Sequence, residues 1–382
     1  MLVVSALLAS LLVPTLAAKT PSPFDSITIS APDGSVKASF IPYGATLTNF
    51  WARDKYGRLR DVAVGYDDKS LYAGNATFGR QYFGPIVGRY ANRIKNGTFA
   101  IDGVEYHVPT NEHGGLNTLH GGNVGYDLRA WKLVSSKKNA VAFSLVDVDG
   151  TEGFPGTVKT TVTYTLNAEG TFHMQIKATA EDKKTPIMLS GHHFWNLEAF
   201  EESQDLFGHW AQFNASRVIE GDSILVPTGN LLDVSKDPYT SLDFRKARSI
   251  GTALSKATFC GAGCTGLDNA WIYDNNTGKS PAMSVWSANS GIRLDITTNQ
   301  PALQIYTCNG IFNAENPIPR KKAQGKGHYT NYSCFVLEQE SWIGAIDDNT
   351  QSWGIDQIYG PGTKNGKEYV WEATHKFSTF KQ

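Results

Sequence analysis

Residues 157–180 read TVKTTVTYTLNAEGTFHMQIKATA, and this stretch decides the fold class. Apolar side chains occupy the even-numbered positions from 158 to 166, except for Thr160, and from 172 to 178, whereas the odd-numbered positions of these two runs are polar. The intervening Asn-Ala-Glu-Gly consists mostly of turn-forming types. Since a period of two places alternate side chains on opposite faces of a strand, the stretch predicts a β-hairpin with one buried face.

Short runs with the same alternation recur along the chain and are separated by turn residues. They cover residues 27–30, 36–41, 141–146, 283–286, 292–296, 303–306 and 335–337. Helical periodicity is confined to short pieces such as 241–254, and residues 313–331, with four basic side chains, are predicted to form a long solvated loop. We find no internal repeat, and no low-complexity linker follows residue 23. We therefore expect an antiparallel all-β protein, a sandwich or a barrel, in a single domain.

The composition is that of a folded chain without strong charge. The 382 residues carry a net charge of −1 at pH 7, with 41% hydrophobic and 19% charged residues. This balance excludes a disordered or fibrous protein and gives no electrostatic reason to expect a nucleic-acid partner. Aromatic residues reach 12%, which suits β-structure and surfaces that stack on ring-shaped ligands.

The chain begins with the apolar segment MLVVSALLASLLVPTLAA, residues 1–18, followed by a polar run. Small residues at its end, and a length below the roughly 20 residues of a membrane span, predict a cleaved secretory signal; an uncleaved anchor is the alternative. We expect a secreted, extracellular protein with no membrane contact after cleavage. Asn-x-Ser/Thr triplets would then offer candidate glycan acceptors at Asn75, Asn96, Asn214, Asn275 and Asn331.

Four cysteines follow, and an even number in an exported chain predicts disulfides. Cys260 and Cys264 close a glycine-rich loop and are expected to pair, which leaves Cys308 for Cys334, although three pairings are open. Zinc is the rival interpretation, but the spacing is not C-x₂-C. Residues 261–266 also match G-x-G-x-x-G. Because a cysteine interrupts the glycines and a strand-like Leu-Asp-Asn-Ala-Trp follows, we predict a disulfide-bound turn and no dinucleotide cofactor.

Four polar residues stand where a sandwich would favour apolar ones. His120 precedes two glycines that would let a ligand approach the backbone, and His192 and His193 lie in an aromatic strand. Glu338 shares a strand face with apolar neighbours, and a carboxylate in such surroundings is a candidate base. Adjacent strand residues face opposite ways, so His192 and His193 are not expected to share a metal ion. Taken singly, each of these residues is more often a packed or solvated side chain than a catalyst.

These residues stand in an ordered series of motifs that resembles the aldose 1-epimerase (galactose mutarotase) family over most of residues 19–382. The series includes Tyr43-Gly44-Ala45, Gly88-Arg89-Tyr90-Ala91-Asn92-Arg93-Ile94, Leu119-His120-Gly121-Gly122, Gly153-Phe154-Pro155-Gly156, His192…Phe194-Trp195-Asn196-Leu197, Pro227-Thr228-Gly229, Gly266-Leu267-Asp268-Asn269, Gln304-Ile305-Tyr306-Thr307 and Leu337-Glu338. Single tripeptides are weak signals, but this order at this spacing is highly specific. The resemblance implies a large antiparallel β-sandwich. It also implies an isomerase that interconverts the anomers of free hexoses, such as galactose and glucose, without metal or cofactor.

Carried over residue by residue, the resemblance implies that Glu338 is the general base, His192 the general acid and His120 a second active-site histidine. The hydroxyl groups of the monosaccharide would be held by Asn92, Arg93, Asp268 and Gln304. Phe194, Trp195 or Tyr306 would be available to stack on the apolar face of the sugar.

Departures from the family pattern also bear on the site. Gly191 replaces the usual Asn before the catalytic histidine, and Ile343-Gly344 replaces the usual Pro-Asp. Glu340 adds an acid on the same strand face as Glu338, where it would disfavour the charged form of that base. The substrate preference is therefore open, whereas the residues that carry the chemistry are retained.

Two functions of other classes stay open. One is a carbohydrate-binding sandwich without turnover, although the joint retention of Glu338, His192 and His120 argues against it. The other is a glycoside hydrolase with Glu338 and Asp268 as paired carboxylates, which requires a carboxyl separation that sequence does not supply. The oligomeric state is not determined by the sequence.

Overall fold

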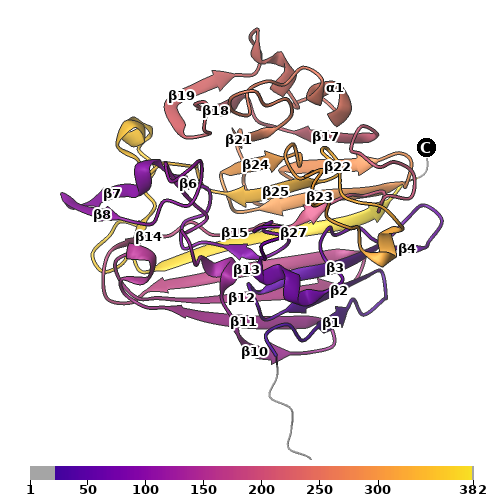
Figure 1. The fold of residues 1–382 in the computed structure, drawn as a ribbon, viewed down its shortest axis with the longest axis horizontal. Coiled ribbons are helices and arrows are strands. Elements are labelled where there is room, and N and C mark those ends of the chain that lie inside the picture. Colours follow the sequence, from indigo (N-terminus) through magenta and orange to yellow (C-terminus); the bar gives the residue numbers. More distant parts are fainter. Residues whose placement is uncertain (1–21, 381–382) are drawn as a thin grey trace, which may run out of the picture.

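The computed structural model describes residues 22–380, and most of its regular structure is β-sheet (Figure 1). The predicted signal sequence, residues 1–18, lies outside the described residues. All strand pairs of the sheets are antiparallel, as the alternation predicts. Among residues 22–380 no helix has the length and apolar character needed to cross a bilayer.

The largest sheet has nine strands and contains the hairpin from which the sequence analysis started. In spatial order its strands are β10 (Lys132–Ser136), β11 (Ala140–Asp147), β12 (Val158–Asn167), β13 (Thr171–Ala180), β27 (Glu368–Thr379), β23 (Ile292–Thr298), β22 (Met283–Ser287), β17 (His209–Phe213) and β20 (Arg248–Ser249). β12 and β13 pair from Val158 opposite Ala180 to Asn167 opposite Thr171. Gly170 closes their turn with a φ of 72°, which glycine adopts without strain.

A six-stranded and a four-stranded sheet form the other layer. The six-stranded sheet runs β16 (Phe194–Trp195), β25 (Phe335–Glu340), β24 (Ala302–Tyr306), β21 (Asp268–Ile272), β18 (Arg217–Gly221) and β19 (Pro227–Asp233). The four-stranded sheet runs β1 (Ile27–Ser30), β2 (Val36–Ile41), β3 (Thr46–Arg53) and β4 (Leu59–Asp61). Every short run predicted as a strand coincides with one of these elements, so the strand predictions are confirmed.

Short elements complete the described chain. Paired two- to four-residue strands are β5 (Ile86–Val87) with β15 (Ser190–Gly191), β6 (Arg93–Ile94) with β9 (Thr118–Leu119), β7 (Thr98–Ile101) with β8 (Val104–His107), and β14 (Thr185–Pro186) with β26 (Ile358–Tyr359). One α-helix, α1 (Ile250–Leu254), and 3₁₀ turns at Lys69–Ala73, Lys95–Gly97, Tyr126–Leu128, Thr151–Gly153, Tyr239–Leu242, Lys322–Gln324 and Asp348–Trp353 make up the helical part of residues 22–380.

Aromatic side chains from both layers meet in the core between the sheets. Phe40 of β2 stacks on Tyr164 of β12 with ring centroids 4.4 Å apart, and Phe50 of β3 lies 4.5 Å from Phe377 of β27. These four side chains are buried. Since burying a large apolar side chain contributes about 1.5–3 kcal/mol, this contact between layers is a main source of stability.

The prediction of a helical stretch over 241–254 is correct only at its two ends, where the 3₁₀ turn Tyr239–Leu242 finishes and α1 forms. Between these ends the chain is irregular up to the short strand β20, and Phe244 packs against Phe213 and Trp271 with ring centroids 5.0 and 6.1 Å away. The carbonyl of Phe244 accepts a hydrogen bond from the backbone N–H of Phe213. Tertiary packing therefore overrides the local helical pattern.

The prediction that residues 313–331 form a solvated loop is wrong for several of its side chains. Lys321 is buried, and its ammonium lies 2.7 Å from the carboxylate of Asp61 and donates to the carbonyl of Thr48. Tyr329 is also buried and donates its hydroxyl proton to the carbonyl of Gly65. These contacts anchor the loop to the four-stranded sheet, because a buried ammonium requires an opposite charge beside it.

Candidate active site

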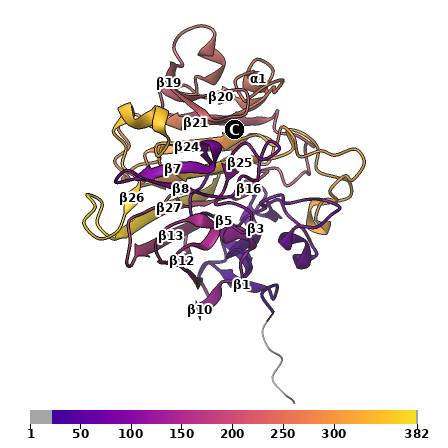
Figure 2. The same cartoon turned by 60° about the vertical axis from the view of Figure 1, so that its left-hand side comes forward.

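The seven residues singled out as site residues line one cavity of ≈ 250 Å³. They are Asn92, Arg93, His120, His192, Asp268, Gln304 and Glu338. Gln304 lies in β24, Glu338 lies in β25, and His192 comes just before β16. These three strands lie next to one another in the middle of the molecule (Figure 2). The volume is below the range of about 300–1,000 Å³ that is usual for drug-sized ligands, so the cavity suits a single small ring.

His192 and Glu338 face each other in this cavity because of strand register. Phe194 pairs with Val336, so the next alternate positions on the two antiparallel strands bring His192 opposite Glu338. The His192 Nε2 atom lies 3.6 Å from Glu338 Oε1. The other ring nitrogen, Nδ1, lies 3.0 Å from the carbonyl of Tyr82, an acceptor that fixes the ring proton on Nδ1 in the neutral form.

His193 points the opposite way, as the strand alternation predicts. It lies outside the cavity and packs in the core, with its ring 5.9 Å from that of Trp195. Trp195 is itself fully buried in the core, so it is not available to stack on a ligand. Phe194 and Tyr306, by contrast, both line the cavity.

His120 is held against the cavity by reciprocal contacts with Asn92. The His120 Nδ1 atom accepts a hydrogen bond from the backbone N–H of Asn92 (3.1 Å), and the backbone N–H of His120 donates to the Asn92 carbonyl (3.0 Å). The expectation that the following glycines admit a ligand is wrong. A Cβ on Gly121 would lie 2.1 Å from the carbonyl oxygen of Gly88, so this glycine makes room for the protein's own backbone.

The positive charge of Arg93 lowers the pKa of Glu338, against the rise that burial causes. The Arg93 guanidinium binds Glu112 through two parallel hydrogen bonds of 2.8 and 2.7 Å, and Nη1 donates to Asn92 Oδ1. This fork geometry is specific to arginine and holds the guanidinium in one orientation. Glu112 also lines the cavity and was missed by sequence reasoning. It lies in a turn, where no periodicity marks a side chain as facing a site.

Asp268 and Gln304 approach the cavity from neighbouring strands. Gln304 Nε2 donates to Asp268 Oδ1 at 2.6 Å, across the β21–β24 pair. Burial raises the pKa of Asp268 to about 6, while Arg93 acts in the opposite direction. The pair therefore offers an acceptor that is held in place and that changes its charge near neutral pH.

The side chains of His120, His192 and Glu338 could also be considered as metal ligands. One donor atom from each lies within 4.8 Å of the others. The tautomer of His120 argues against such a role. Its Nδ1 accepts from a backbone N–H, so the neutral ring carries its proton on Nε2 and has no lone pair free for a cation.

Comparison with known proteins agrees with this geometry. The model of the family described as aldose 1-epimerase matches residues 25–360. A probable aldose 1-epimerase from Arthroderma benhamiae is 40% identical, over 94% of this chain and 87% of its own length, and a galactose mutarotase from Bos taurus is 33% identical over 90% and 91%. The chain belongs to the aldose 1-epimerase family. Its activity is therefore that of an isomerase, and the family implies a monosaccharide substrate.

The fold agrees with that of solved members of the epimerase family. An aldose epimerase homologue from C. elegans superposes with a TM-score of 0.79 and 27% identity, over 93% of this chain and 99% of the other. A galactose 1-epimerase from Lactobacillus acidophilus, at 22% identity, has the same fold with a TM-score of 0.71. The expected mutarotase-like β-sandwich is thus confirmed.

Burial controls the charges of the epimerase site. Burial lowers the pKa of His192 to about 4. It also lowers the pKa of His120 well below its usual range, and the electrostatic effect of the neighbouring His192 adds to this decrease. Burial also raises the pKa of Glu338 well above its usual range, and the charge of Glu340 adds to this rise. A proton shared by the facing pair therefore rests on Glu338, and His192 is neutral.

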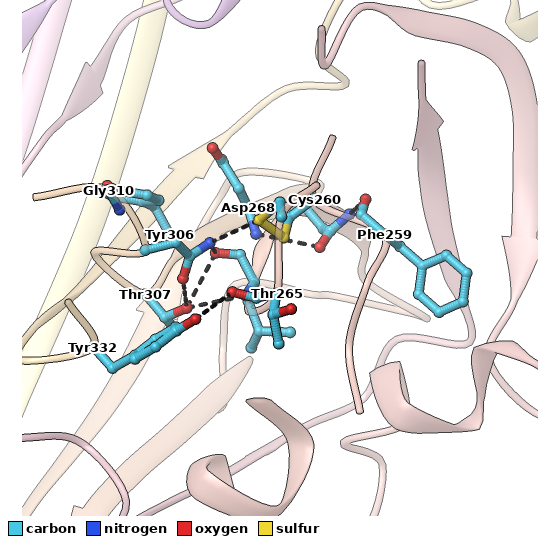
Figure 3. Close-up of a disulfide and its surroundings, with 12 residues drawn as sticks. Phe259, Cys260, Thr265, Asp268, Tyr306, Thr307, Gly310 and Tyr332 are labelled. Atoms are coloured by element: carbon cyan, nitrogen blue, oxygen red, sulfur yellow. Dashed lines mark hydrogen bonds between the residues drawn. A yellow bond between two sulfur atoms is a disulfide. The ribbon is translucent and has the colours of Figure 1, made fainter. Parts of the chain in front are cut away.

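Two disulfides lie beside strands β21, β24 and β25, with the pairing expected from the sequence. Cys260–Cys264 closes a turn just before β21, and Cys308–Cys334 joins the segment after β24 to the start of β25. Figure 3 shows the disulfide at Cys260 close to Asp268 and to Thr307, whose hydroxyl accepts the N–H of Leu267. The G-x-G-x-x-G match is thus a disulfide-bound turn that leads into a strand, as predicted.

Proposed function

We propose that this epimerase interconverts the α and β anomers of free hexoses such as galactose and glucose, with Glu338 as general base and His192 as general acid. The observation that carries the proposal is the facing pair itself. Two proton carriers lie 3.6 Å apart on one side of a small cavity whose remaining polar groups are suited to sugar hydroxyls. Mutarotation needs these two carriers and no change of oxidation state.

The reaction balances with the single proton that the pair holds. Glu338 first passes its proton to Nε2 of His192, which lies 3.6 Å away. As the carboxylate, Glu338 then takes the proton of the anomeric O1 hydroxyl while the C1–O5 bond breaks and its electrons move to O5. His192, as the imidazolium, gives its proton to O5, which leaves an open-chain aldehyde, a carboxylic acid and a neutral imidazole. Rotation about C1–C2 presents the other carbonyl face, and the reverse transfers close the ring as the opposite anomer.

The buried site favours the opened intermediate in this scheme. Ring opening converts the charged pair into the neutral pair, which is the form that burial stabilises for both Glu338 and His192. Ring opening therefore recovers the free energy that was spent in forming the charged pair from the neutral pair. Each positioned carrier contributes about 10²–10⁴-fold to the rate.

The other cavity residues position the sugar in our proposal. Asp268 and Arg93 bind hydroxyl groups through charge-assisted hydrogen bonds, with Asn92 and Gln304 as neutral partners. His120 donates from Nε2, because its Nδ1 is already used by the Asn92 N–H. Phe194 and Tyr306 offer ring surfaces for the apolar face of the sugar.

Polarimetry tests the proposed activity directly. Freshly dissolved α-D-galactose and α-D-glucose should each reach anomeric equilibrium faster with the protein than in buffer alone, and a chelator should leave the excess rate unchanged. Binding of either sugar without excess rate would instead favour a carbohydrate-binding sandwich. Release of new reducing ends from a glycoside would favour hydrolysis.

We also propose that the protein is exported. The apolar segment 1–18 supports this, as do two disulfides and four exposed triplet asparagines, Asn96, Asn214, Asn275 and Asn331. Expression in a eukaryotic host should yield a medium fraction whose first residue follows position 18 and whose mass falls on treatment with an N-glycosidase. Retention of the intact N-terminus inside the cells would overturn this part of the proposal.

A further inference from the structure

A second buried carboxylate stands beside the proposed base. Glu340 follows Glu338 by two positions on β25, so both side chains project from the same face of the strand. Their exposed fractions are 0% and 2%. Two carboxylates so deeply buried on one face cannot both be charged without strong opposing contacts.

The contacts around the two carboxylates differ. Glu340 Oε1 accepts a hydrogen bond from Asn92 Nδ2 at 3.1 Å, and Asn92 Oδ1 in turn accepts from Arg93 Nη1 at 3.1 Å. This relay extends the positive charge of Arg93 toward Glu340. The Oε2 atoms of Glu338 and Glu340 have no hydrogen-bond partner in the described part of the chain.

Several charged and titratable groups surround Glu338 and Glu340, and Arg93 is the one that carries a positive charge. These groups are Arg93 and its partner Glu112 on and near β6, Asp268 on β21, His120 after β9, His192 before β16, and the hydroxyls of Tyr90 and Tyr369. Asn92 donates to Glu340, whereas Arg93 lowers the pKa of both carboxyl groups. Burial raises the pKa of Glu340 to about 8 and that of Glu338 well above its usual range, so a negative charge forms on Glu340 before it forms on Glu338. A proton held by the pair of carboxylates then lies on Glu338.

We propose that Glu340 is a positioning residue of this epimerase: its carboxylate orients the amide of Asn92 and keeps on the Glu338–His192 pair the single proton that the reaction moves. The proposal rests on the proposed function and assigns Glu340 no contact with the reacting atoms. Without the negative charge of Glu340, the pair loses its proton at a lower pH and can no longer protonate O5. Glu340 thus extends the activity toward alkaline pH.

The expected shift follows from the strand geometry. Positions i and i+2 of a strand are about 6.6 Å apart, and a charge at that distance changes a pKa by about 1–2 units at the effective dielectric of a protein site. Glu340→Gln should therefore move the alkaline limb of the kcat/KM profile about 1–2 pH units toward acid. KM should change little, since the glutamine Oε1 still accepts from Asn92.

The experiment is buffer-corrected polarimetry with α-D-galactose from pH 5 to 10 on wild type, Glu340→Gln and Glu340→Asp. The aspartate variant keeps the negative charge, so the alkaline limb of its kcat/KM profile should lie at the same pH as in wild type. Glu198→Gln is the matched control, because Glu198 is a fully buried carboxylate outside the cavity that hydrogen-bonds to Ser287 and Asn289. Glu198→Gln should leave the alkaline limb of the kcat/KM profile at the wild-type pH.

Each outcome separates this inference from the proposed activity. If wild type shows no excess rate, the proposed function fails. If wild type is active and the Glu340→Gln limb coincides with that of wild type, the role of Glu340 is refuted. If a variant fails to fold, infrared titration of the wild-type protein still tests the proposal. Infrared titration should show a carboxylic acid that persists above pH 7, and complete ionisation of all carboxyl groups by pH 6 would overturn the proposal.

Discussion

Asp268→Asn is the substitution for which the structure gives the sharpest numerical expectation. Burial raises the pKa of Asp268 to about 6, and its Oδ1 is already held by Gln304. A raised pKa means that the carboxylate gains its proton as the pH falls through 6. The ionised fraction drops from about nine-tenths at pH 7 to about one-tenth at pH 5. If the sugar hydroxyl binds the carboxylate, KM of wild type rises about tenfold over this interval.

The asparagine variant should lack this pH dependence. It loses a hydrogen bond to a charged group, worth about 1.5–3 kcal/mol, so KM at pH 7 should be about 10–150-fold higher than in wild type and should stay constant from pH 7 to 5. kcat should fall less, because Asp268 does not transfer a proton in the proposed scheme. Initial rates at varied α-D-galactose, followed by polarimetry, measure both constants.

The same substitution should stabilise the fold at alkaline pH. Since the pKa of Asp268 is higher in the folded chain than its ordinary 3.8, the native state loses stability as the pH rises through 6. Asp268 keeps some exposure to the cavity, so Asp268→Asn should add about 1–3 kcal/mol to the free energy of unfolding at pH 8 and little at pH 4. A wild-type KM that is flat between pH 5 and 7 would refute this reasoning, as would an asparagine variant that retains the wild-type profile.

Two further substitutions test the packing. Lys321→Met leaves the buried carboxylate of Asp61 without its ammonium and should cost about 3–5 kcal/mol in urea unfolding, most of which the additional Asp61→Asn should restore; a loss below 1 kcal/mol would contradict the ion pair. Burial lowers the pKa of His375 to about 3, so the histidine stabilises the fold above pH 6.5 and loses that contribution as the pH falls toward 3. His375→Phe should therefore lose about 2 kcal/mol less stability than wild type between pH 7 and 5, and an equal loss in both proteins would speak against a buried neutral ring.

The sandwich was predictable because its long strands keep one face dry. The alternation in β12 and β13 is a direct consequence of burial on one side, and it is visible over ten residues in each strand. The two-residue strands that carry or flank the site, β6, β9, β15 and β16, are too short to show a period. Their residues were placed by motif resemblance and not by periodicity.

Other features depend on tertiary contacts that no local pattern contains. The local sequence predicts a solvated Lys321 because its neighbours are basic. The side chain is instead buried against Asp61, which lies in a distant part of the sequence. The carboxylate of Glu112 is held by a hydrogen bond from Arg93, which lies in an earlier segment of the chain. Phe244 leaves a helical pattern because Trp271 offers it a buried surface. In each case the deciding partner is remote in sequence, so the local residues alone predict the wrong state or none.

The most direct test of the facing proton carriers is polarimetry of α-D-galactose with Glu338→Gln, combined with calorimetric measurement of sugar binding to the same variant. Glutamine fills nearly the same volume but cannot take the O1 proton. The excess rate should fall by about 10²–10⁴-fold while galactose still binds. A variant that equilibrates the anomers at the wild-type rate would contradict the proposed role of Glu338 as the general base.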